Sequence, residues 1–256
     1  MIEARDLTRL YGEKLALDHL NLSVAPGEIV GLLGPNGAGK TTTVKILTCM
    51  LPPSSGSAHV AGHDVSSDPL EVKRRIGFVP ESGALYENLT ANEYLEFVAH
   101  LHHLDPEPAR RRIAEMFELL GLLPDADQRM TSFSKGMKQK VLIAAALVHN
   151  PDVLFLDEPL NGIDANGAAL IKELMRQLAA SGKSILFCSH VLDVVERVCH
   201  RIVIVSGGRV LADGTAAELV TRTRTARLED AFVKLTSGGD LAGARADSFL
   251  RVVGRG

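Results

Sequence analysis

The sequence is poor in aromatic residues and in cysteine. It contains no tryptophan, three tyrosines and eight phenylalanines among its 256 residues. Its three cysteines, Cys49, Cys188 and Cys199, are widely separated and form no C-x-x-C pair. An odd number of isolated cysteines favours neither a disulfide framework nor a zinc site. We therefore expect no zinc ion and a reducing, cytoplasmic environment.

The sequence also lacks long apolar runs and an excess of basic charge. The run from Val141 to Val148 is among the longest apolar stretches, well short of the roughly 18 residues of a membrane helix. Residues 1–6 do not have the basic-then-apolar layout of a secretion signal. A formal net charge of −3 gives no general attraction to nucleic acid. We expect no nucleic-acid partner, and contact with a membrane only through another protein.

What the sequence does contain is a regular alternation of strand and helix patterns. We predict strands at 2–10, 15–24, 29–33, 57–60, 76–79, 153–157, 184–189 and 201–206, and helices at 41–50, 69–75, 165–180 and 191–198. Residues 85–150 differ, because their apolar spacing and capping signals are almost entirely helical. This pattern predicts an α/β fold with a mainly parallel sheet, an N-terminal antiparallel β subdomain and an inserted helical subdomain.

The chain is predicted to form one main domain followed by a tail. We place the domain at residues 1–220, with the helical subdomain at about 85–150. Residues 221–256 are expected to be a partly flexible tail with a possible short helix at 228–235, since 238–256 are rich in Gly, Ala, Arg and Asp.

A phosphate-binding loop organises the chain. The loop fits the pattern G-x-x-x-x-G-K-[ST], and it lies between the apolar strand at 29–33 and a helix. Its residues are Gly34, Pro35, Asn36, Gly37, Ala38, Gly39, Lys40, Thr41 and Thr42. In such a loop, successive backbone N–H groups and the start of the helix face one anion. Lys40 is expected to reach the terminal phosphates and the Thr41 hydroxyl to face a magnesium ion. This loop alone predicts nucleotide binding, and together with the strand–helix alternation we expect a P-loop NTPase core.

Two further sites of chemistry follow other predicted strands. The apolar run 153–156 ends in Asp157 and Glu158, and His190 follows the strand at 184–189. The carboxyl ends of parallel strands meet at the edge where ligands bind. Asp157 at that edge suits a magnesium ligand, and Glu158 suits a base that polarises water for attack on the γ-phosphate. A lone histidine there is often structural, but at this edge His190 is placed to hydrogen-bond the γ-phosphate.

With these motifs, the chain resembles the nucleotide-binding subunit of an ATP-binding cassette (ABC) transporter over residues 1 to about 220. The segment 134–140, Ser-Lys-Gly-Met-Lys-Gln-Lys, is similar to the family signature L-S-G-G-Q, and 161–164 ending in Asp164 resembles the loop after the second acidic motif. Tyr11 falls where the family stacks a ring on adenine, although it could instead cover the sheet edge. The resemblance implies ATP and Mg²⁺ as the ligands.

The resemblance also implies an assembly. In the family, two cassettes dimerise head to tail, so that Ser134 and Gly136 of one chain would bind the γ-phosphate held by the other. The second cassette would be another copy or a paralogue. Integral membrane subunits would complete the transporter, with this chain on the cytoplasmic face of the membrane.

Two positions depart from the family pattern. Glu81 stands where the family usually has glutamine, and its carboxylate could bind magnesium or the attacking water. Lys135 replaces the first signature glycine and Met137 the glutamine; we expect Lys135 to face solvent rather than phosphate. Both changes are similar to a branch of exporter cassettes with separate membrane subunits, which favours export of a drug-like or other small molecule. The alternative is a soluble cassette ATPase acting on ribosomes or DNA.

Overall fold

A six-stranded sheet forms the centre of the molecule, in a computed structural model that describes residues 1–81 and 85–237. Its strand order is β10-β9-β3-β8-β7-β6, and all neighbours are parallel except β10 and β9. The strands are β3 (Ile29–Leu33), β6 (Ile76–Val79), β7 (Val153–Asp157), β8 (Ser184–Cys188), β9 (Arg201–Ser206) and β10 (Arg209–Gly214). The predicted, mainly parallel sheet is confirmed.

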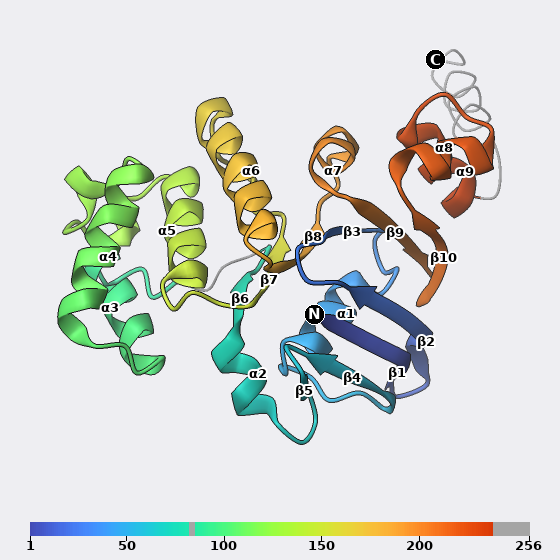
Figure 1. The fold of residues 1–256 in the computed structure, drawn as a ribbon, viewed down its shortest axis with the longest axis horizontal. Coiled ribbons are helices and arrows are strands. Elements are labelled where there is room, and N and C mark those ends of the chain that lie inside the picture. The colour runs from blue at the N-terminus through green and yellow to red at the C-terminus, as the bar shows by residue number, and fades with distance from the viewer. Residues whose placement is uncertain (82–84, 238–256) are drawn as a thin grey trace, which may run out of the picture.

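A second, four-stranded antiparallel sheet packs beside the first through helix α1 (Lys40–Leu47), as Figure 1 shows. Its order is β2-β1-β4-β5, with β1 (Ile2–Tyr11), β2 (Lys14–Val24), β4 (Ser55–Val60) and β5 (His63–Asp64). Side chains of β3 alternate between the two faces of the central sheet. Val30 and Leu32 join the core shared with this second sheet, whereas Ile29 and Leu33 join the core on the opposite face.

Helices cover that opposite face. They are α6 (Ala165–Ala180), α7 (Leu192–Val198), α8 (Ala216–Thr223) and α9 (Leu228–Ser237), and each contributes a side chain to the same core. Helix α9 confirms the short helix predicted at 228–235, and its residue Leu228 is 1% exposed. The predicted tail from 238 onward lies outside the described residues.

The inserted helical subdomain lies at one end of the sheet, the green part of Figure 1. It contains α3 (Ala91–Leu101), α4 (Pro106–Leu119), α5 (Lys135–Leu147) and two 3₁₀ turns, η1 (Leu123–Asp125) and η2 (Met130–Ser132), around a core of its own. Thr90 and Glu93 form a capping box at the start of α3. Helix α5 also packs against the central sheet through Ile143 and Ala146. The start of α5 therefore has a fixed place relative to the strands.

Several predicted boundaries were wrong by a few residues. The helix after the phosphate loop begins at Lys40 and ends at Leu47, and the strand predicted to reach Ser189 ends at Cys188. The strand β5, the two 3₁₀ turns and the helix α2 (Pro69–Arg75) complete the fold; of these only α2 was predicted. No helix in the described ranges 1–81 and 85–237 has the length and apolar character to cross a membrane.

Candidate active site

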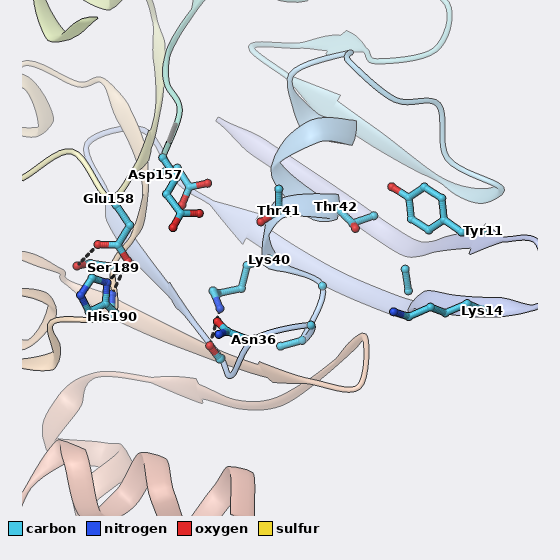
Figure 2. Close-up of a pocket in the computed structure, with 16 residues that line it drawn as sticks. Tyr11, Lys14, Asn36, Lys40, Thr41, Thr42, Asp157, Glu158, Ser189 and His190 are labelled. Atoms are coloured by element: carbon cyan, nitrogen blue, oxygen red, sulfur yellow. Dashed lines mark hydrogen bonds and ion pairs between the residues drawn. The ribbon is translucent and has the colours of Figure 1, made fainter. Parts of the chain in front are cut away.

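A cleft of about 740 Å³ opens at the carboxyl edge of the central sheet, where β3, β7 and β8 end. Figure 2 shows Tyr11 and Lys14 at one end, Glu158, Ser189 and His190 at the other, and Lys40 between them. The residues that line it are Tyr11, Lys14, Ala16, Gly34, Asn36, Gly37, Ala38, Gly39, Lys40, Thr41, Thr42, Glu81, Asp157, Glu158, Ser189 and His190. The cleft brings together almost all of the phosphate loop and the acidic residues that were predicted to act with it.

The phosphate loop connects β3 directly to helix α1. Gly39 precedes the helix with φ of 108°, a conformation that side chains rarely adopt. An added Cβ there would also lie 2.9 Å from the carbonyl oxygen of Ala16. The Lys40 ammonium donates to the carbonyl oxygens of Gly34 at 2.5 Å and Pro35 at 3.2 Å. The Lys40 ammonium and the positive end of the α1 dipole therefore lie in one short loop, which is suited to bind an anion.

Three carboxylates face this loop across the cleft. Asp157 is the last residue of β7, and Glu158 and Glu81 follow β7 and β6. Burial and, after it, the negative charges of Glu81 and Glu158 raise the pKa of Asp157 to about 6, against an opposing effect of Lys40. Negative charge is thus crowded beside Lys40, and a bound cation would relieve that crowding.

The donors fit a hard divalent cation such as Mg²⁺, which prefers oxygen ligands. They are the carboxylates of Asp157 and Glu81 and the hydroxyl of Thr41, all of which line the cleft. Among the described residues, no group of three or more His, Cys, Asp and Glu side chains could hold a metal ion alone. Mg²⁺ usually takes only one or two carboxylates and completes its shell with phosphate oxygens and water.

Glu158 and His190 are in direct contact. Glu158 has φ of 49°, and its backbone N–H donates to the Cys188 carbonyl oxygen at 2.9 Å. Its Oε1 accepts hydrogen bonds from the backbone N–H of His190 at 2.6 Å and from His190 Nδ1 at 2.8 Å. Its Oε2 accepts a bond from the Ser189 hydroxyl at 3.1 Å. The segment after β8 therefore fixes the orientation of the carboxylate that follows β7.

Sequence reasoning missed two polar residues that line the cleft. Ser189 is 7% exposed; besides donating to Glu158, its oxygen accepts a bond from the backbone N–H of Val191 at 3.2 Å. A hydroxyl directly before His190 was a signal that could have been used. Lys14 begins β2 of the other sheet, and no motif in the sequence marks it.

Tyr11 lies at the mouth of the cleft, at the end of β1. Its side chain is 45% exposed, and the Arg9 guanidinium lies 5.0 Å from the ring centroid. The ring is therefore supported on the side of Arg9 and accessible to a planar ligand.

The signature residues and Asp164 lie outside this cleft. The Ser134 hydroxyl accepts a hydrogen bond from the Met137 N–H at 3.2 Å and so caps α5. Asp164 caps α6 by accepting bonds from two backbone N–H groups, at 3.0 and 2.9 Å, and these bonds lower its pKa. Lys135 was expected to face solvent rather than phosphate; it is exposed, and its ammonium donates to the Asn161 side-chain oxygen at 2.9 Å.

Comparison with known proteins shows the family of this chain. The family model described as ABC transporter matches residues 17–161. The linearmycin resistance ATP-binding protein LnrL of Bacillus subtilis (strain 168) is 37% identical over 239 residues, which are 93% of this chain and 76% of LnrL. The daunorubicin resistance ATP-binding protein DrrA3 of Streptomyces coeruleorubidus is 40% identical over 236 residues, 92% of this chain and 74% of DrrA3.

A solved structure supports the same assignment. The dimeric post-hydrolysis form of the ATP-binding cassette MJ0796, bound to ADP and Pi, matches with a TM-score of 0.77 and 28% identity. The match covers 84% of this chain and 98% of that one. The resemblance inferred from the motifs is confirmed. The chain belongs to the ABC transporter family, in which it is an ATP-binding subunit that hydrolyses ATP.

Proposed function

We propose that this subunit binds ATP between its own phosphate loop and the signature segment of a second cassette, and that hydrolysis there drives export of a drug-like small molecule. The observation that carries the proposal is the single cleft in which the loop 34–42, the acidic residues and the Glu158–His190 pair meet. Two copies, or one copy and a paralogue, would share each ATP.

The shape of the cleft supports one orientation of the nucleotide. The phosphate loop lies between the two ends of the cleft, with Tyr11 at one end and Glu158 at the other (Figure 2). Adenine would stack on the exposed Tyr11 ring, which is worth roughly 1–3 kcal/mol for a base on an aromatic side chain. The γ-phosphate would then lie near Lys40, with Glu158 beyond it.

Mg²⁺ would be held by Thr41 and Asp157, with Glu81 as a further carboxylate beside them. When bound, it would neutralise charge on the β- and γ-phosphates. The raised pKa of Asp157, caused by burial and by its acidic neighbours, supports this placement, because a cation there would be attracted to three carboxylates at once.

Glu158 would act as the general base. Its carboxylate would take a proton from water as the water oxygen attacks the γ-phosphorus. The bond between that phosphorus and the bridging oxygen then breaks, which leaves ADP and phosphate. Ser189 and the backbone of His190 would hold the carboxylate for this step, and the His190 ring would bond the γ-phosphate.

The second cassette would complete the site with residues that lie outside the cleft of their own chain. Ser134 and Gly136 stand at the start of α5, where a hydroxyl and free backbone N–H groups can bind an anion. Asp164 caps α6 and would shape the loop that faces the partner. The dimeric form of MJ0796 with ADP and Pi is consistent with such a shared site.

The names of the relatives point to the kind of transport. LnrL and DrrA3 are both named resistance ATP-binding proteins, for linearmycin and daunorubicin. We infer that this chain serves separate integral membrane subunits from the cytoplasmic face and that its cargo is of a similar kind. Residues 1–220 would form most of the ATPase domain, and α8 and α9, which pack on its core, would extend it beyond 220.

The substitution Glu158→Gln tests the proposal. Because the amide cannot accept the proton of water, steady-state ATP hydrolysis should fall at least about 100-fold. ATP binding should persist, so size-exclusion chromatography with ATP should show a trapped dimer. Lys40→Ala is the control and should lose both nucleotide binding and the dimer. Wild-type rates of hydrolysis in Glu158→Gln would refute the assignment of the base.

A further inference from the structure

We propose that Lys135 and Asn161 form a positioning pair, which links the signature segment to the catalytic loop of the same chain. The idea rests on the proposed function, because that function places the two segments in different ATP sites of the dimer. Lys135 is the first residue of α5, directly after Ser134. Asn161 follows Glu158 by three residues, and its backbone N–H donates to the Glu158 carbonyl oxygen at 3.1 Å.

The position of Lys135 is electrostatically unfavourable unless another group compensates it. A cation at the start of a helix opposes the helix dipole, and the first turn of α5 contains no acidic residue. Its ammonium is held by the side-chain oxygen of Asn161 at 2.9 Å. A neutral acceptor stabilises the lysine without cancelling its charge.

The backbones of the two segments are also in close contact. A Cβ atom built on Gly136 would lie 2.5 Å from the carbonyl oxygen of Gly162, so only glycine allows this approach. The aliphatic part of Lys135 covers Gly162, because a Cβ built there would lie 2.9 Å from Lys135 Cγ. A shift of the loop 158–162 would therefore move the start of α5, and a shift of the start of α5 would move the loop.

The consequence is a short physical connection between the two ATP sites of a dimer. Glu158 begins this loop and would lie beside the γ-phosphate of its own site, so a change at that phosphate would act on the loop. Through Lys135, the same loop positions Ser134 and Gly136, which would contact the ATP held by the partner. Lys135 is thus a positioning residue: it acts through Asn161 on Glu158 and on the signature, and needs no contact of its own with the nucleotide.

The test compares Lys135→Met, Asn161→Ala and the double variant in the full-length chain, with ATP hydrolysis measured against ATP concentration. Each single variant should lower kcat about fivefold, the effect of losing one such hydrogen bond. In each single variant, the Hill coefficient of ATP hydrolysis should fall toward one. The Kd of a fluorescent ATP analogue should change less than about twofold. The double variant should be no worse than either single variant, because both remove the same contact.

Two controls separate this contact from a general effect of charge. Lys234→Met removes another lysine that bonds a neutral oxygen at 2.9 Å, that of Thr223, but it lies on α9 and should leave hydrolysis unchanged. Lys135→Arg keeps a donor and should retain cooperativity. If Lys135→Met does not fold, Asn161→Ala and Lys135→Arg still test whether the contact between Lys135 and Asn161 affects kcat and cooperativity.

Additive losses of kcat in the double variant would refute the proposed pair. A loss of kcat in Lys135→Met with no loss in Asn161→Ala would also refute it. The ATP-dependent dimer of Glu158→Gln is measured in parallel. If no such dimer forms, the proposed function itself fails. A trapped dimer together with wild-type kinetics in Asn161→Ala refutes only the positioning pair.

Discussion

Replacing the partly buried His149 should remove much of the sensitivity of the fold to mild acid. The His149 ring stacks on His102, with ring centroids 3.6 Å apart and planes 13° from parallel. Its Nε2 lies 2.9 Å from the Ile76 carbonyl oxygen, and its buried Nδ1 has no partner among the described residues. Burial, as the largest cause, and the nearby charges of His102 and Lys183 together lower the pKa of His149 to about 4, against an opposing effect of the bond to Ile76.

The sign follows from proton binding. The pKa of an unfolded histidine is about 6.5, so between pH 6.5 and pH 4 the unfolded chain binds more protons than the folded one. The stabilising contribution of neutral His149 is therefore complete above pH 6.5 and is lost as the pH falls toward 4. These two pKa values correspond to about 2 kcal/mol lost by pH 5. Because the ring is partly exposed to water, we expect about 1 kcal/mol.

The assay is urea denaturation of the wild type and of His149→Gln at pH 7.5 and pH 5. The wild type should lose about 1 kcal/mol more free energy of unfolding than the variant over this range. The matched control is His100→Gln, which removes an exposed histidine from α3 and should retain the wild-type dependence. Equal losses in the wild type and in His149→Gln would refute the reasoning.

Two further predictions concern the hydrogen bonds of Arg201, which connect the two sheets, and the hydrogen bond from Ser189 to Glu158. Arg201 donates to Glu28 Oε1 at 2.7 Å, to Asp213 at 2.7 Å and to the Ser23 carbonyl oxygen at 2.6 Å. Arg201→Ala should therefore lower the free energy of unfolding by about 2 kcal/mol in urea denaturation, and a change under about 0.5 kcal/mol would contradict this. Ser189→Ala should lower kcat for ATP about tenfold while the Kd for ATP stays the same, because the hydroxyl bonds Glu158 and not the phosphate loop. An equal loss of ATP affinity would mean that Ser189 contacts the nucleotide.

The strands and the phosphate loop could be predicted because their signals are local. Four apolar residues before Asp157 indicate a buried strand wherever they occur, and a glycine-rich segment between strand and helix limits the backbone to few shapes. The topology rule for parallel sheets then placed Asp157 and His190 at one edge. These steps need no knowledge of side-chain packing.

The contacts within the site could not be predicted in the same way. The bonds from Ser189 and His190 to Glu158 depend on the register of two strands, in which Asp157 lies opposite Cys188. Lys14 reaches the cleft from a different sheet, and the bond from Lys135 to Asn161 joins segments 26 residues apart in sequence. Such contacts are set by tertiary packing, about which a single sequence carries only weak local signals.

Charge gives a physical reason why two copies would need ATP between them. The cleft of each chain carries the carboxylates of Glu81, Asp157 and Glu158. In the proposed dimer this cleft would face the first two turns of α5, where the ammonium groups of Lys135 and Lys140 donate to neutral oxygens rather than to carboxylates. These carboxylates and lysines are opposite in charge, which would favour encounter but would leave the anion-binding groups of both sides unfilled. The γ-phosphate would satisfy the phosphate loop and the signature together. Hydrolysis would then cleave ATP into ADP and phosphate at the bond that Glu158 helps to break, so the γ-phosphate that joins the two chains would no longer be attached to the nucleotide.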